Sequence, residues 1–108
     1  MEVIQIKPQE LEKYLNNTKL VYVDFWASWC MPCKAMSYRF EELTNNVSSS
    51  NVVFVSIQID EEIEFAEHYD IKSVPTFALF KDGREVFRKT GMSSVEQLMT
   101  PIETLEEI

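Results

Sequence analysis

The sequence predicts an α/β fold, in which a mixed central β-sheet of about five strands is flanked by four helices. First, the apolar pattern switches repeatedly between the period of a strand and the period of a helix. Second, the resulting order is β-α-β-α-β-α-β-β-α, and its crossover connections place the early strands parallel. Third, the last two strands flank the turn sequence "KDG" and form an antiparallel hairpin.

The N-terminal part predicts a strand, a helix and a second strand. The segment "VIQI" at 3–6 alternates and is short, which suits an edge strand. The segment at 9–17 follows a proline, carries apolar residues on one helical face and ends in asparagine. The segment "LVYVDF" at 20–25 is almost continuously apolar, as expected of a strand buried on both faces.

The central part predicts two further helices around a third buried strand. The first helix has an apolar stripe formed by Met36, Phe40, Leu43 and Val47. The polar stretch at 44–51 is interpreted as a loop, and "VVFVSIQI" at 52–59 as a buried strand. The acidic start of 60–69 favours a helix N-terminus, with Asp60 as the expected N-cap.

The C-terminal part predicts the hairpin strands at 76–80 and 84–90 and a final helix that starts at Ser94. Gln97 completes a capping box with Ser94. Pro101 lies inside this helix and follows Thr100, and "TPIE" is itself an N-terminus signature. We therefore expect a kink or break near Thr100. The apolar face of the helix consists of Val95, Leu98, Met99, Ile102 and Leu105.

The composition bounds the class of protein. The 108 residues fit one domain spanning 1–108, and 45% apolar residues are enough for a core. The net charge of −8 argues against nucleic-acid binding through a basic surface and against polybasic membrane attachment. No signal peptide and no run of about 18 apolar residues is visible. We expect a monomeric cytoplasmic protein.

The two cysteines carry the chemistry. Cys30 follows the second strand and opens a helix, where the free amides and the helix dipole favour its thiolate. Cys33 lies one turn further on the same side, and Pro32 fits the first helical turn. Cys33 can therefore resolve a mixed disulfide formed at Cys30. Half of a zinc site and a pair of buried structural thiols remain as alternatives.

The segment "VDFWASWCMPCK" at 23–34 resembles the active-site segment of the thioredoxin family, which usually reads V-D-F-W-A-x-W-C-G-P-C-K. "SVPT" at 73–76, "FKDG" at 80–83 and "TG" at 90–91 are similar to further motifs of that family, in the same order. The resemblance runs from the first strand to the last helix. It implies the thioredoxin fold and thiol–disulfide oxidoreductase activity.

The resemblance also implies catalytic roles for three residues. Cys30 would be the attacking nucleophile and Cys33 the resolving thiol. Asp24 would be a buried carboxylate whose raised pKa lets it accept and return the proton of Cys33 through a water. The ordinary alternative for Asp24 is a carboxylate at a strand end with a satisfied hydrogen bond.

Substrate-binding roles are implied in the same way. Pro75 would be a cis-proline that lets the Val74 backbone pair with an extended substrate. Trp29 would shield the cysteine pair and contact substrate, and Gly91 would permit close approach of the last loop to the site. Trp26 is interpreted as a packing residue that supports the loop. The expected substrate-binding set is Trp29, Met31, Pro32, Val74, Pro75, Gly91 and Met92.

The sequence departs from the family pattern at several positions. Met31 replaces the usual glycine, and with Met92 it is expected to widen an apolar docking surface. Ser56 stands where a lysine is frequent, which should make Asp24 harder to ionise. Tyr38 replaces a proline that often kinks the active-site helix, so we expect a straighter helix.

The leading functional prediction is the reduction of disulfide-containing protein substrates, with recharging by a thioredoxin reductase. No cofactor is expected in this chain, because any nicotinamide cofactor belongs to the reductase. The alternatives are an oxidase or isomerase of the same fold and a non-catalytic binding module or subunit.

Overall fold

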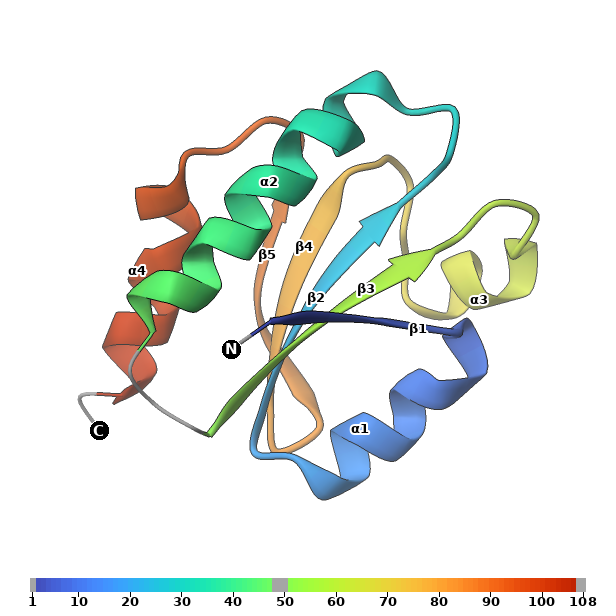
Figure 1. Ribbon diagram of the computed structural model, residues 1–108. Helices are drawn as coiled ribbons and strands as arrows, with labels where there is room; N and C mark the ends of the chain where they lie inside the picture. The colour runs from blue at the N-terminus through green and yellow to red at the C-terminus, as the bar shows by residue number, and fades with distance from the viewer. Residues whose placement is uncertain (1, 48–50, 107–108) are drawn as a thin grey trace.

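The computed structural model describes residues 2–47 and 51–106 and contains a five-stranded sheet in the order β1-β3-β2-β4-β5 (Figure 1). Strands β1, β3 and β2 are parallel, whereas β4 is antiparallel to β2, and β5 to β4. The mixed sheet predicted from the sequence is confirmed. The strands are β1 (Val3–Ile6), β2 (Leu20–Trp26), β3 (Val52–Gln58), β4 (Thr76–Lys81) and β5 (Arg84–Thr90).

Helices lie on both faces of the sheet. Helices α2 (Met31–Asn46) and α4 (Val95–Glu106) cover one face, and α1 (Leu11–Asn17) and α3 (Ile63–His68) cover the other (Figure 1). A 3₁₀ turn at Pro8–Glu10 leads into α1. Within the described ranges, no helix has both the length and the apolar character needed to cross a bilayer.

The core consists of two apolar layers, one on each face of the sheet. The side chains of β2 alternate between them: Tyr22 packs toward α2 and α4, and Val23 and Phe25 pack toward α1 and α3. The Tyr22 hydroxyl donates a hydrogen bond to the Leu98 carbonyl at 2.8 Å. It ties the central strand to α4. The layer under α2 and α4 includes Leu20, Tyr22, Met36, Phe40, Leu43, Phe54, Phe77, Leu79, Leu98 and Ile102.

The connection from β4 to β5 is a two-residue turn. Asp82 and Gly83 have φ values of 51° and 82°, as a type I′ turn requires. The predicted hairpin is therefore present.

The break expected near Thr100 is absent, because α4 continues from Val95 to Glu106 with Pro101 inside it. The Thr100 hydroxyl donates to the Glu96 carbonyl at 2.8 Å and does not cap a second helix. Leu98 and Ile102 precede and follow Pro101 and are both fully buried. Burial of both residues outweighs the one backbone hydrogen bond that Pro101 removes.

The loop expected at 44–51 begins later than predicted, because α2 continues through Asn46. The Thr44 hydroxyl donates to the Glu41 carbonyl at 2.6 Å, and Thr44 is buried. Residues 48–50 of the expected loop lie outside the described residues. α2 passes Tyr38 without interruption, in agreement with the absence of a proline there.

Candidate active site

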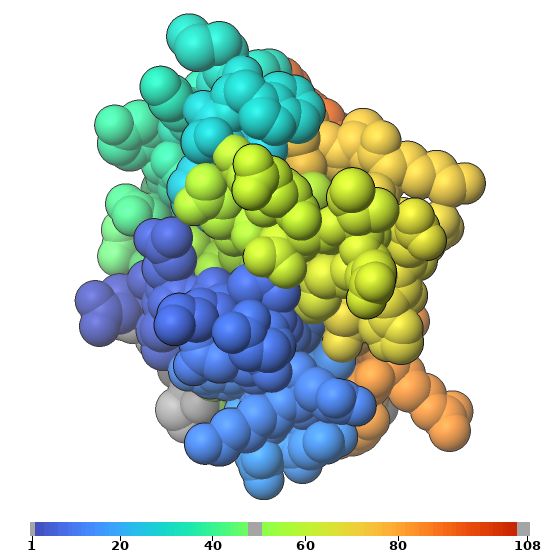
Figure 2. All heavy atoms as spheres, turned by 90° about the vertical axis from the view of Figure 1, so that its right-hand side faces the viewer, coloured from blue at the N-terminus to red at the C-terminus, as the bar shows by residue number. Residues whose placement is uncertain are grey.

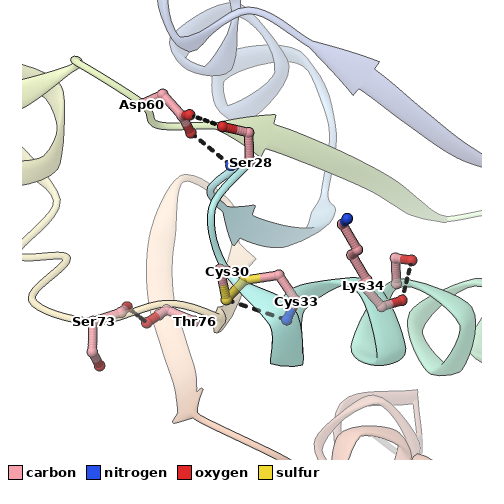
Figure 3. The surroundings of a disulfide bond; sticks show 8 residues. Ser28, Cys30, Cys33, Lys34, Asp60, Ser73 and Thr76 are labelled. Carbon is pink, nitrogen blue, oxygen red and sulfur yellow. Dashed lines mark hydrogen bonds between the residues drawn. A yellow bond between two sulfur atoms is a disulfide. The ribbon is translucent and has the colours of Figure 1, made fainter.

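Cys30 and Cys33 form a disulfide at the N-terminus of α2 (Figure 3). Cys30 is the N-cap with extended backbone, and its Sγ accepts a hydrogen bond from the Cys33 amide at 3.2 Å. The two Cα atoms are 5.3 Å apart. Pro32 lies in the first turn, where its missing N–H would have had no helical partner. The helix start predicted from the cysteine spacing is therefore confirmed.

The position of Cys30 favours its thiolate once the disulfide is open. The Cys33 amide already points at the Cys30 sulfur, and the positive end of the α2 dipole adds to its effect. Trp29 and Met31 flank Cys30 and are 73% and 72% exposed. A partner that approaches the disulfide therefore meets two large apolar side chains.

Asp24 lies on the central strand β2 and is 2% exposed. Burial raises the pKa of its carboxyl from 3.8 to about 7. Its Oδ1 has no hydrogen-bond partner among the described residues, so the alternative of a fully satisfied carboxylate does not hold. Ser56 is its direct neighbour on β3, and this neutral residue brings no cation to the carboxylate.

A cavity of about 280 Å³ has both Asp24 and Cys33 in its lining. Its remaining wall is mixed: Val3, Trp26, Ala27 and Phe40 are apolar, and the polar side chains are Gln5, Ser28, Lys34, Ser37, Glu41 and Ser56. A water molecule occupies about 30 Å³ in the liquid, so the cavity has room for several. This arrangement allows a proton to pass between the Asp24 carboxyl and the Cys33 sulfur through water.

Two loops meet beside the disulfide. The Val74–Pro75 peptide bond is cis, as expected, and Val74 packs against the cluster of Cys30, Cys33 and Ala27. The Gly91 amide donates to the Pro75 carbonyl at 2.9 Å and joins the last loop to the cis-proline loop. The cis-proline loop thus lies against the disulfide, and the loop after β5 is bonded to that loop.

The reason expected for Gly91 is wrong. A Cβ atom added at Gly91 would meet no atom within 4 Å, so no close approach requires a glycine there. The φ of Gly91 is +82°, a left-handed conformation that other residues rarely adopt. Gly91 therefore serves the turn that precedes Met92, which is 51% exposed.

Asp60 does not cap α3, contrary to the prediction. Both of its carboxylate oxygens accept hydrogen bonds from Ser28, one from the amide at 2.9 Å and one from the hydroxyl (Figure 3). The side-chain and backbone hydrogen bonds from Ser28 lower the pKa of Asp60. α3 begins only at Ile63, with Glu62 as its N-cap.

The Ser28–Asp60 contact ties the active-site loop to the loop that leads into α3. Figure 2 shows the yellow-green surface of this second loop between the cyan active-site segment and the blue N-terminal region. The contact joins residues 32 positions apart in the sequence. No local pattern at either position signals it, which is why the sequence analysis missed it.

The described ranges contain no group of three or more histidine, cysteine, aspartate or glutamate side chains that could hold a metal ion.

The model of the family described as Thioredoxin matches residues 2–104. The chain belongs to the thioredoxin family. Among curated relatives, the thioredoxin of Chlamydia caviae is 43% identical over 82 residues, which cover 76% of this chain and 78% of the relative.

Further thioredoxins give the same result. The thioredoxin of Coprinus comatus is 34% identical over 82 residues, which cover 76% of this chain and 77% of the relative. The solved structure of reduced Schistosoma mansoni thioredoxin pre-protein is similar with a TM-score of 0.81 and 34% identity, covering 96% of this chain and 98% of that chain. Membership in the thioredoxin family and the close cysteine pair identify a thiol–disulfide oxidoreductase that reduces protein disulfides.

Proposed function

We propose that the chain works in the cytoplasm as a monomeric single domain spanning 1–108, and that a thioredoxin reductase returns it to the dithiol form. The observation that carries its mechanism is the Cys30–Cys33 disulfide at the start of α2, with Asp24 and Cys33 in the lining of one cavity. The acidic net charge of −8 favours a protein that stays separate in solution.

The reduction of a substrate takes two exchange steps. The Cys30 thiolate attacks one sulfur of the substrate disulfide; a mixed disulfide forms, and the other substrate sulfur leaves as a thiolate that takes up a proton. The Cys33 thiolate then attacks the Cys30 sulfur, which closes the Cys30–Cys33 disulfide and releases the second substrate sulfur. Two electrons pass to the substrate.

Asp24 acts as the base of the second step. Its carboxylate takes the proton of the Cys33 thiol through water in the cavity, and its carboxyl returns a proton after exchange. A pKa of about 7 leaves the group partly ionised at neutral pH, so it can both accept and donate. The charge that the base needs is present only when the pH approaches or exceeds this value.

Protein substrates dock on the apolar rim of the disulfide. Trp29 and Met31, on either side of Cys30, present exposed side chains there, and the exposed Met92 follows Gly91, whose amide is bonded to Pro75. The cis bond at Pro75 presents the Val74 backbone to an extended substrate segment, and Pro32 fixes the turn that carries Met31.

The base role is tested by the pH dependence of mixed-disulfide resolution, followed by rapid mixing and mass spectrometry. For the wild type we expect a rate that rises through pH 7. Asp24→Asn should lose this inflection and keep the rate of the first attack by Cys30. Glu61→Gln is the matched control, because it removes an exposed carboxylate from the loop that leads into α3 and leaves the Ser28–Asp60 contact in place. An unchanged profile in Asp24→Asn would rule out the base role.

The direction of electron flow is tested by the reduction potential in glutathione buffers. A reduction potential of about −270 mV agrees with a reductant, and a reduction potential of about −120 mV agrees with an oxidase. Recharging is tested by NADPH consumption with a thioredoxin reductase and insulin. No consumption with active reductase would exclude this partner. Sedimentation of the purified chain tests the monomeric state.

A further inference from the structure

Ser93 lies on the loop between β5 and α4, and both of its backbone groups are bonded to side chains of α2. It is 2% exposed. Its amide donates to Met36 Sδ at 3.4 Å, and its carbonyl accepts from Arg39 Nη1 at 2.8 Å. The same Arg39 nitrogen lies 3.9 Å from Met36 Sδ. The helix that carries the cysteines therefore holds this loop at one residue.

The hydrogen bonds continue from Ser93 to the cis-proline. The Ser93 hydroxyl donates to the Gly91 carbonyl at 3.2 Å, and the Gly91 amide donates to the Pro75 carbonyl at 2.9 Å. Met92 lies between the two anchored residues and has an exposed side chain. Its position relative to the disulfide is therefore set by bonds on both sides.

Arg39 is the stronger of the two anchors on α2. A guanidinium donor gives a charge-assisted hydrogen bond, whereas a thioether is a weak acceptor. In the part of the chain that the structure describes, Arg39 has no ion pair with an acidic residue. The bond to the Ser93 carbonyl is thus the principal polar contact of its side chain.

We infer that Arg39, assisted by Met36, is a positioning residue that holds the loop 91–93, and with it Met92, in place for the docking of protein substrates. The inference rests on the proposed role of Met92 in docking. Arg39 acts through the loop and touches no reacting atom, so its loss should weaken the binding of protein substrates. The chemistry at the disulfide and the exchange with small disulfides should stay unchanged.

The test compares Arg39→Leu and Arg39→Lys with wild type on insulin, a protein disulfide, and on DTNB, a small disulfide. We expect Arg39→Leu to raise KM for insulin about threefold to tenfold, the range of one ordinary hydrogen bond, because Arg39 is exposed and acts on the loop and not on the substrate itself. The values of kcat, the DTNB rate and the reduction potential should stay at wild type. Arg39→Lys should recover part of the loss, because lysine can donate to the same carbonyl.

Arg84→Leu is the matched control. It removes the same kind of side chain and the same charge at the turn end of the β4–β5 hairpin. The pair of Thr76 and Thr90 lies at the other end of this hairpin. We expect wild-type kinetics from this variant. In the double variant of Arg39→Leu and Met92→Ala, the effects on KM should be less than multiplicative if Arg39 acts through Met92.

Unchanged KM for insulin in Arg39→Leu, equal losses on insulin and DTNB, or fully multiplicative effects in the double variant would each overturn the inference. Inactivity of the wild type on both substrates would have another meaning. It would reject the proposed function itself, and the inference with it.

Discussion

The buried carboxyl of Asp24 should make the disulfide form less stable as the pH rises from about 4 to about 7. Burial raises the pKa of this group from 3.8 to about 7, so the folded state binds the proton more tightly than the unfolded state. Each pKa unit corresponds to about 1.4 kcal/mol, so a shift of about three units corresponds to about 4 kcal/mol. Small domains have a free energy of unfolding of about 5–15 kcal/mol, so this effect is large.

The sign follows from the two protonation states. Below about pH 4 the carboxyl is protonated in both the folded and the unfolded chain, and burial of Asp24 costs no charge. Above about pH 7 both states are ionised, and the full cost of a buried charge is present. Asp24→Asn keeps the shape and removes the charge, so its stability relative to wild type should increase by about 4 kcal/mol across this range.

The assay is urea unfolding of the oxidised protein at pH 4, 6 and 8, followed by tryptophan fluorescence. The quantity compared is the difference in unfolding free energy between Asp24→Asn and wild type at each pH. Asp60→Asn is a control of opposite sign, because the pKa of Asp60 is lowered and its carboxylate stabilises the fold once ionised. A difference for Asp24→Asn that does not change with pH would refute the reasoning.

Three further variants test the docking surface and the packing. Met31→Gly should raise KM for insulin about fivefold, or about 1 kcal/mol, and leave the DTNB rate unchanged; equal kinetics on insulin would exclude a docking contact. Phe40→Ala should lower the free energy of unfolding by about 3–5 kcal/mol, because Phe40 is 1% exposed in the layer under α2; a loss below 1 kcal/mol in urea unfolding would contradict the packing described. Pro101→Ala should raise it by about 1–3 kcal/mol, because it restores a backbone donor inside the continuous helix α4; a loss of stability in the same assay would show that Pro101 suits its place.

The sequence predicted the elements whose local pattern and tertiary environment agree. The continuous apolar run of β2 predicted a strand buried on both faces, and the spacing of Met36, Phe40 and Leu43 predicted the buried side of α2. The capping box of Ser94 and Gln97 is present, with hydrogen bonds of 2.8 and 3.1 Å. Each of these signals acts within one element, so the sequence alone contains it.

The predictions failed where contacts between distant parts of the chain outweigh a local sequence signature. Asp60 has the local signature of an N-cap, but Ser28 of the active-site loop supplies its donors. Thr100 and Pro101 have the signature of a new helix, but burial of their neighbours keeps α4 continuous. Arg39 gave no signal, because its acceptor is a backbone carbonyl 54 positions further along the chain.

The chemistry of the candidate site was predictable from the sequence, but the packing of side chains around Asp24 and Cys33 was not. The spacing of Cys30 and Cys33 and the resemblance carried by 23–34 indicated the disulfide and the buried Asp24. The cavity that joins Asp24 to Cys33 depends on side chains from β1, β2, β3 and α2 together. Such a volume follows from tertiary packing and has no counterpart in a linear pattern.

The disulfide joins residues separated by only three positions, and it has a consequence for the molecule as an electron carrier. A link across so short a span restricts the unfolded chain far less than a link between distant segments. Cys30 and Cys33 cluster with Ala27, apart from the two apolar layers that hold the sheet and helices together. We therefore expect the fold to stay intact while the protein takes up and releases electron pairs over many cycles. The change in oxidation state is confined to the N-terminus of α2.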